Sequence, residues 1–278
     1  MASLLALLSS VLWGSADFFG GKLAKRFPAL AVTGLSQAMG LLFGIGAIIA
    51  TSSFHAPSLD WHSYALPGII AGIAGFLGLV SFYSGLATGR MGVVSPISSL
   101  GALIPLTVAL LQGERPTSLQ LLGMVIALLG AFCASGPEIN SGLPMKPLLF
   151  ALGATGGFGI CLTFMAMGSS DSSLLTMTTM RVTSVTIAVV LALRFRSLGG
   201  LGLVNLPLLI FIGVADFLAN FTIGVATTKG LVSITMVLGS LFPIVTSVLA
   251  YKFLHERLHK VQYVGIVFAI LGISLISL

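Results

Sequence analysis

Long apolar stretches alternate with short connectors along the whole chain. The length of each stretch is close to the length of a membrane-spanning α-helix, which needs about 20 residues to cross a hydrocarbon layer of about 30 Å. The connectors contain Gly, Pro or charged residues and are too short to form a separate domain. The pattern predicts about ten membrane-spanning helices, at residues 2–21, 29–51, 64–86, 92–111, 117–135, 146–167, 174–193, 206–227, 231–250 and 261–278. The number falls to nine if one weakly separated pair forms a single helix.

The composition identifies lipid as the surrounding solvent. Hydrophobic residues make up 56% of the 278 residues and charged residues 7%, against about 25% charged in an ordinary soluble domain. The first apolar run has no basic start, and the segment from Trp13 to Asp17 does not resemble a signal-peptide cleavage site. We therefore expect this run to be a retained helix of an all-α, polytopic membrane protein.

The second half of the chain repeats the first. Five residues recur at a constant offset of 142, and the residues between them are similar. The pairs are Glu114 and Glu256, Arg115 and Arg257, Gln120 and Gln262, Gly123 and Gly265, and Gly130 and Gly272. Upstream, residues 85–90 resemble residues 224–229, and Trp13 falls near the equivalent of Phe158. We expect one five-helix repeat at residues 1–140 and another at 145–278.

An odd number of helices in each repeat predicts that the two copies are inverted relative to each other in the membrane. Inverted repeats are typical of secondary transporters, in which two similar halves exchange conformations around a central binding site. The alternative is that the duplication produced only a larger helical bundle, without a transport cycle.

Several short motifs resemble those of EamA-type permeases, a family of the drug/metabolite transporter superfamily. They are the segments Trp13–Phe18, Ala87–Arg90, Gly113–Arg115, Ser240–Pro243 and His255–Arg257. The resemblance covers both halves and implies a ten-helix carrier that exports amino acids, related metabolites or drugs. The halves differ at one point, because the equivalent of Pro243 in the first half is Gly101 and the nearest proline is Pro105. Any hinge in the first half is therefore expected one turn away.

Ionisable residues at membrane depth are candidates for the substrate site, because each costs about 2.5–3.5 kcal/mol on insertion scales. Asp216 lies near the middle of its predicted helix, and Asn220 follows one turn later on the same face. Arg181 reaches a similar depth from the opposite side of the membrane. A pair relieves the cost of both charges, so we predict an Arg181–Asp216 ion pair or a shared water-filled cavity.

Two roles of that pair remain open. The pair can be a permanent strut between two helices. Alternatively, Arg181 binds a substrate carboxylate while Asp216 binds an amino group or a coupling proton. The two roles predict different outcomes for Asp216→Asn, either less folded protein or abundant protein whose transport is uncoupled from pH.

Other polar and aromatic residues are weaker candidates. Asp17 shares a helix face with Trp13, but its position near a helix end is equally consistent with a side chain that reaches toward water. Trp13 lies near mid-helix, away from the interface that membrane Trp prefers, and this position favours a cavity wall or a packing role. The remaining candidates are Tyr83, Phe158 and Gln37, which can also pack against or hydrogen-bond a neighbouring helix.

Glu114 and Glu256 follow helix ends, and each precedes an Arg. In an inverted repeat the two lie on opposite membrane faces, which excludes a shared carboxylate site. We expect each of them to form a local helix cap or an ion pair at the membrane rim.

The basic residues are distributed unequally between the connectors. Ten Lys and Arg residues lie in the odd-numbered connectors and two, Arg115 and Lys229, in the even-numbered ones. The ten are Lys22, Lys25, Arg26, Arg90, Lys146, Arg194, Arg196, Lys252, Arg257 and Lys260. The positive-inside rule then places the odd connectors in the cytoplasm and both termini outside, whereas the family resemblance implies cytoplasmic termini.

These features favour a secondary transporter, with the lipid bilayer, a small-molecule substrate and a coupling proton or cation as its partners. We expect a multi-pass protein of the plasma or inner membrane that needs no cofactor, metal or nucleic acid. A membrane-embedded enzyme is the alternative, but the four histidines all lie in connectors and no catalytic set converges. A translocase of lipids or lipid-linked groups is a further variant, whereas a channel would need more polar residues at membrane depth. Cys133 and Cys161 are expected to be buried, unpaired residues.

Overall fold

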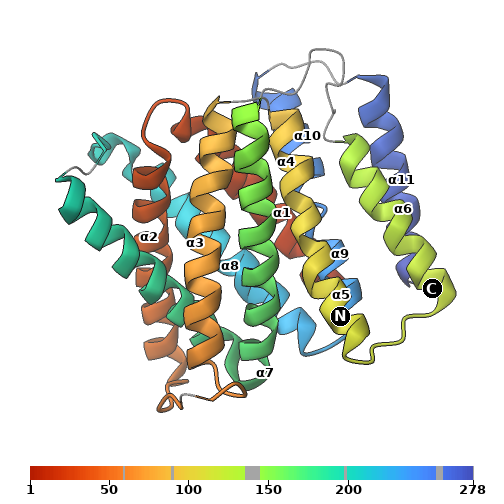
Figure 1. Ribbon diagram of the computed structural model, residues 1–278, viewed down its shortest axis with the longest axis horizontal. Helices are drawn as coiled ribbons and strands as arrows, with labels where there is room; N and C mark the ends of the chain where they lie inside the picture. Colours follow the sequence, from red (N-terminus) through yellow and green to blue (C-terminus); the bar gives the residue numbers. More distant parts are fainter. Residues whose placement is uncertain (59, 89–90, 135–144, 197–198, 255–258, 278) are drawn as a thin grey trace.

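The computed structural model describes residues 1–278 except 59, 89–90, 135–144, 197–198, 255–258 and 278. The described residues form helices and connectors without any strand. The helices are α1 (Ala2–Ala24), α2 (Ala29–Thr51), α3 (Ala65–Thr88), α4 (Met91–Ser99), η1 (Leu100–Ala102), α5 (Leu103–Leu111), α6 (Ser118–Ala134), α7 (Met145–Phe195), η3 (Leu203–Asn205), α8 (Leu206–Thr227), α9 (Val232–Gly239), α10 (Phe242–Leu254) and α11 (Lys260–Ser277). Most of them run roughly parallel or antiparallel to one common direction (Figure 1).

The predicted helix boundaries agree closely with the structure. Eight helical segments among the described residues are long and apolar enough to cross a membrane, and α6 is a shorter apolar helix. One of the eight, α7, has 51 residues, but Ser172 inside it has a non-helical backbone. A straight helix of that length would measure about 75 Å, more than twice the hydrocarbon thickness. Counting α7 as two crossings gives about ten membrane-spanning segments, as expected.

Two of the crossings are interrupted near their middle. In the first repeat η1 separates α4 from α5, and in the second repeat Ser240 and Leu241 separate α9 from α10. Pro243 follows the second break, where it cannot donate a backbone hydrogen bond. At the offset of 142, the equivalents of Ser240 and Leu241 directly precede η1. The break in the first half therefore lies less than one turn from the position equivalent to the break in the second half. The position of Pro105 had suggested a displacement of one turn.

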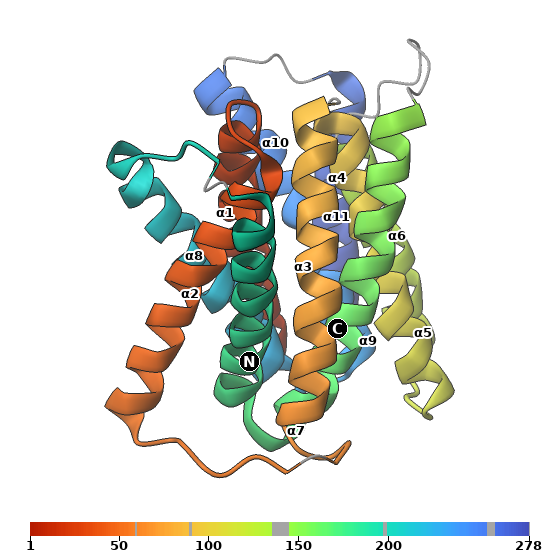
Figure 2. The same cartoon turned by 60° about the vertical axis from the view of Figure 1, so that its left-hand side comes forward.

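The fifth helices of the two repeats, α6 and α11, show how the halves are related. They pack side by side at one edge of the molecule (Figures 1 and 2). A methyl group added to Gly123 would lie 2.9 Å from the carbonyl oxygen of Gly272, and one added to Gly130 would lie 2.8 Å from that of Gly265. The repeat exchanges these two contacts, since Gly123 is equivalent to Gly265 and Gly130 to Gly272. The two helices are thus antiparallel around a local two-fold axis.

The first helices of the repeats obey the same symmetry. A methyl group added to Gly14 of α1 would lie 2.6 Å from the carbonyl oxygen of Phe242, and one added to Gly159 of α7 would lie 2.9 Å from that of Gly101. Likewise, α1 packs on α8 while the first part of α7 packs on α3. The first helix of each repeat therefore packs on the third helix of the other repeat, as expected for inverted repeats.

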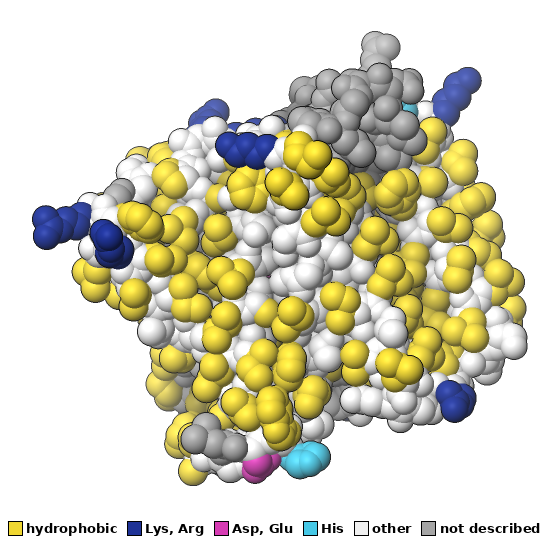
Figure 3. Space-filling model, viewed as in Figure 1, with side chains coloured by type: hydrophobic (Ala, Val, Ile, Leu, Met, Phe, Trp, Pro, Cys, Tyr) yellow, Lys and Arg dark blue, Asp and Glu magenta, His cyan; other side chains and the backbone are white. Residues whose placement is uncertain are grey.

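The flanks and ends of the molecule differ in polarity. Hydrophobic side chains are spread over the flank in Figure 3, whereas most of the visible Lys and Arg side chains lie at its upper and left-hand edges. The connector after α7 contacts the one after α1, since Gly199 lies against Pro28 and Ala31. At the opposite end, Gly230 before α9 lies against Ala2 of the N-terminal helix. Among the described connectors, those after α1 and α7 thus lie together at one end, and the one after α8 lies at the other end beside the N-terminus.

A polar cluster ties two even connectors together. Asp171, beside the break in α7, accepts a hydrogen bond from the backbone N–H of Tyr64 at 2.9 Å and lies 3.7 Å from His55 Nε2. Burial raises the pKa of the Tyr64 phenol, and the negative charge of the nearby Asp171 carboxylate raises this pKa further. These contacts join the connector between α2 and α3 of the first repeat to the bend in α7 of the second.

Five residues of the repeat and family motifs lie outside the described residues. They are Gly89, Arg90, His255, Glu256 and Arg257.

Candidate functional site

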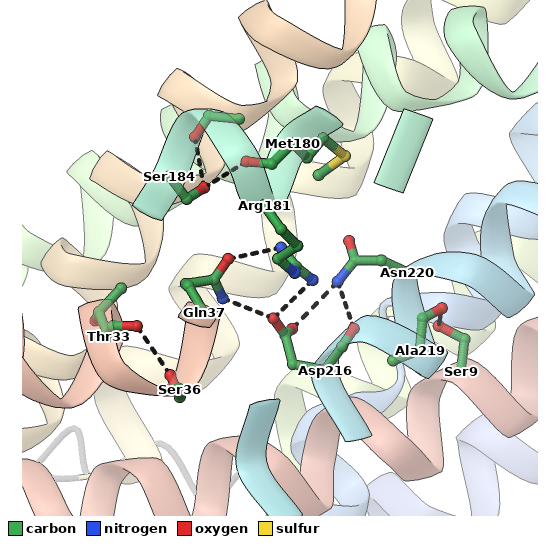
Figure 4. A network of polar contacts seen from close by, with 11 residues as sticks. Ser9, Thr33, Ser36, Gln37, Met180, Arg181, Ser184, Asp216, Ala219 and Asn220 are labelled. Carbon is green, nitrogen blue, oxygen red and sulfur yellow. Dashed lines mark hydrogen bonds and ion pairs between the residues drawn. The ribbon is translucent and has the colours of Figure 1, made fainter. Parts of the chain in front are cut away.

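Four polar side chains from three helices form a network in the middle of the protein (Figure 4). Arg181 of α7 donates to Asp216 of α8 at 2.9 Å and to Gln37 of α2 at 2.7 Å. Gln37 in turn donates to the same oxygen of Asp216 at 2.9 Å. Asn220, one turn after Asp216, donates to its other carboxylate oxygen at 3.2 Å and to its backbone carbonyl at 2.7 Å. The predicted Arg181–Asp216 ion pair is thus present.

The network is removed from solvent. The Arg181 side chain is 5% exposed and that of Asp216 is 12% exposed. The Asp216 carboxylate accepts three hydrogen bonds from side chains, which offsets much of the cost of its burial. The guanidinium of Arg181 also lies 5.9 Å from the centre of the Phe217 ring, within the range of a cation–π contact. Its Nε has no hydrogen-bond partner among the described residues.

Beside this network lies a cavity, and the empty space within it and at its opening to solvent totals about 700 Å³. It is lined by side chains from both repeats, and apolar and aromatic residues dominate its wall. Arg181, Asp216, Asn220 and Gln37 contribute one polar wall. The interrupted helices contribute another, through Ser98, Ser99 and Ser240.

Three further residues selected from the sequence line this cavity. Trp13 and Phe158 occupy related positions in the first helix of each repeat, and both face the cavity. Asp17 lies one turn after Trp13 on α1, is 7% exposed and also lines the cavity. Its side chain therefore does not reach toward water, which was the alternative to a ligand role for Asp17.

Tyr83 is a site candidate that lies outside the cavity wall. It is 1% exposed, and its hydroxyl packs tightly against Gly20 of α1. Its ring is 6.0 Å from that of Phe82 in the apolar core, and it is not among the residues that line the cavity. Because a larger side chain at Gly20 would collide with Tyr83, we assign this contact to helix packing.

Sequence reasoning missed part of the wall. Ser98, Ser99 and Ser240 reach the cavity because the helices break beside them, and their hydroxyls bond to backbone carbonyls of the preceding turn. Phe242 starts the helix after the second break and packs 6.5 Å from the Trp13 ring. The signal was present in the segment from Ser240 to Pro243, which contains a Ser and a Pro within an apolar run.

Glu114 has a different partner from the one expected. Its carboxylate accepts hydrogen bonds from the backbone N–H of Val232 at 2.6 Å and from the backbone and side chain of Ser233 at 3.0 and 2.6 Å. Glu114 therefore does form a helix cap, but the expectation that the cap is local is wrong. Glu114, which follows α5 of the first repeat, caps the N-terminus of α9 in the second, where unpaired N–H groups attract a carboxylate.

Comparison with known proteins agrees with this architecture. The model of the EamA-like transporter family matches residues 1–136 and again residues 145–278. One solved crystal structure of a protein has a TM-score of 0.78 to this chain at 17% identity, with 99% of this chain and 97% of that one covered. At such low identity the likeness concerns the fold alone. No curated protein matches the sequence.

Proposed function

The chain belongs to the EamA-like transporter family, and on that premise we propose that it is a secondary transporter that exports a small metabolite. The family and the apolar helices identify a multi-pass membrane transporter. Beyond this, we propose the plasma or inner membrane as its location and an amino acid, a related amphipathic compound or a drug as its substrate. The two repeats are proposed to span residues 1–140 and 145–278.

The position of the cavity is the observation that supports this function best. Its wall combines side chains of α1, α2, α3 and α4 with side chains of α7, α8 and α10. A site shared between inverted repeats can open toward either membrane face as the repeats exchange conformations.

We assign distinct roles to the polar and aromatic walls. Arg181 and Asn220 present polar groups to the substrate, and Asp216 holds both side chains in position through its hydrogen bonds. Trp13 and Phe158 contact the apolar part of the substrate. Energy for export comes from a coupled proton or cation gradient or from the gradient of the substrate itself.

Purified protein in liposomes loaded with a metabolite extract provides the test of transport. A carrier gives saturable counterflow, in which an internal compound drives uptake of the same labelled compound. Conduction at the rate set by the gradient would indicate a channel, and a chemically altered product would indicate an enzyme. Profiling the medium of cells with and without the protein identifies which compound to label.

A cavity-filling variant makes this test specific to the site. Ala102 of η1 lines the cavity and is 2% exposed, so Ala102→Trp is expected to abolish counterflow by occupying the site. Leu122 of α6 is 52% exposed on the flank, and Leu122→Trp is the matched control that should retain transport. Gel filtration of both variants checks that each is folded. Equal counterflow in the two would contradict the proposed path.

A further inference from the structure

The charges around the cavity do not balance. Two carboxylates, Asp17 and Asp216, and one guanidinium, Arg181, line it. With all three ionised, the cavity carries one excess negative charge in a region of low dielectric constant. Such a charge is costly unless a cationic group or a proton accompanies it.

The two carboxylates differ in their partners. Asp216 is held by Arg181, Gln37 and Asn220. Asp17 is 7% exposed, and within the described part of the chain its carboxylate has neither a hydrogen bond nor an ion pair. Both carboxylates line the same cavity, so that their charges repel each other when both are ionised. Asp17 is therefore the carboxylate that can take an incoming cationic group without breaking the network.

The surroundings of Asp17 suit one kind of cation. Trp13 lies one turn away on the same helix face, and Phe158 and Phe242 complete an aromatic surface around the cavity. Trp13 and Phe242 meet edge to face at 6.5 Å. A carboxylate beside aromatic rings binds ammonium groups through an ion pair together with cation–π attraction. The remaining wall contains apolar side chains such as Leu79, which fit an apolar substrate body.

We propose that Asp17 is the substrate-amine site of this cavity and that the transported compounds are amphipathic monoamines. The inference rests on the proposed transport function and narrows its substrate class. The ammonium group pairs with Asp17 and balances the excess charge, while the apolar body lies against Trp13, Phe158 and Phe242. A zwitterion leaves the charge unbalanced, and an anion increases it.

Four other ionisable groups lie in the cavity wall or against α1. Asp216 of α8 and Arg181 and Cys161 of α7 line the cavity, and Tyr83 of α3 packs against Gly20 of α1. Among these only Arg181 is cationic, and its Nη atoms already bond to Gln37 and Asp216. When no amine is bound, a proton on Asp17 serves the same purpose. Binding of the ammonium ion then transfers this proton to solvent.

The fluorescence of Trp13 can be used to measure binding in the cavity. It has two Trp residues, of which Trp13 lines the cavity and Trp61 is 52% exposed in the connector before α3. A Trp61→Phe protein in lipid nanodiscs thus reports only Trp13 fluorescence. Four probes with the same ring are titrated: 2-phenylethylamine, phenylalanine, 3-phenylpropionate and 2-phenylethanol. The amine is expected to bind at least about tenfold more tightly than each of the others, a difference of about 1.4 kcal/mol.

Variants of Asp17 then test whether its carboxylate is the origin of the preference for the amine. In the Trp61→Phe background, Asp17→Asn should reduce amine affinity to that of the alcohol, and Asp17→Glu should retain the preference. Asp60→Asn also removes one carboxylate, but in an exposed connector, and should change nothing. Unchanged amine affinity in Asp17→Asn would overturn the proposal. If that variant does not fold, the four-probe series on the parent still decides, because equal or weaker binding of the amine overturns the proposal by itself.

Failure of this inference can be separated from failure of the transport function. Counterflow of extract metabolites without amine preference would reject the amine site and leave the carrier in place. Amine binding without any counterflow would reject the carrier and leave the amine site.

Discussion

The Asp216 carboxylate is stable in its buried position because three neighbouring side chains donate hydrogen bonds to it. One of them, Gln37, is 179 residues away in the sequence and comes from the other repeat. Sequence reasoning placed Arg181 and Asp216 at similar depths, because depth follows from the helical rise. It ranked Asp216 above Asp17 from depth alone, because it could not foresee which groups the fold brings next to each carboxylate.

Replacement of Asp216 by Asn is the direct test of the network. The variant leaves the buried charge of Arg181 without its counter-charge, and breaking a buried pair in this way costs about 3–5 kcal/mol. We expect lower yield and lower thermal stability of Asp216→Asn in detergent, measured by gel filtration after heating. The double variant Arg181→Gln with Asp216→Asn removes both charges and should recover much of the loss.

The opposite outcome has a clear meaning. Abundant, stable Asp216→Asn with altered pH dependence of transport would identify Asp216 as a coupling residue. Wild-type stability together with wild-type pH dependence would exclude both roles.

At the scale of helices, the sequence predicts the elements well and their interruptions poorly. The predicted ranges 29–51 and 206–227 coincide with α2 and α8. Hydropathy and flanking prolines mark such ends clearly. The breaks at η1 and between α9 and α10 occur inside apolar runs, where hydropathy does not distinguish helical from non-helical backbone. The capping of α9 by Glu114 was also missed, because its partner lies 118 residues away.

Close contact between α6 and α11 depends on glycine. A methyl group at Gly265 would collide with the backbone of Ala134, whereas one at Gly46 of α2 would meet nothing within 4 Å. Gly265→Ala is therefore expected to destabilise the protein by about 1–3 kcal/mol through overpacking. Gly46→Ala is the control and should be neutral or slightly stabilising. Thermal unfolding of both variants in the same detergent tests this, and equal midpoints would contradict the α6–α11 contact.

The Glu114 cap joins the two repeats at the even-connector end. Glu114→Ala removes three hydrogen bonds to the start of α9, and loss of a helix cap typically costs about 1 kcal/mol. The exposed neighbour Arg115 provides the control, since Arg115→Ala removes a charge but no described contact. We expect a lower unfolding midpoint for Glu114→Ala than for Arg115→Ala. An intermediate value for Glu114→Gln, which keeps one acceptor oxygen, would support the cap, whereas equal midpoints for all three would oppose it.

At the scale of the whole molecule, the fold was predictable because a duplicated apolar pattern leaves few arrangements. Lipid requires helices, and an odd number of helices in each repeat requires inversion. The contacts between Gly123 and Gly272 and between Gly130 and Gly265 bear out that symmetry. The orientation in the membrane depends on the bilayer and on insertion, and it remains a prediction of the charge count.

Labelling from outside the cell tests that orientation. In a protein without Cys133 and Cys161, a cysteine replaces Lys25 at the charge-rich end or Ser53 at the opposite end, both exposed. The charge count predicts that an impermeant thiol reagent labels Ser53→Cys and not Lys25→Cys in intact cells. The reverse result would place both termini in the cytoplasm, as the family resemblance implies.

Access to the cavity tests the central claim most directly. Ser99 lines the cavity at the break between the two parts of its crossing and is 5% exposed, and Ser99→Cys preserves its size. In the cysteine-free background, we expect an impermeant reagent to label this residue from either membrane face. We also expect a bulky reagent attached from one face to prevent counterflow. Labelling from one face only, under all substrate and ion gradients, would contradict alternating access through this cavity.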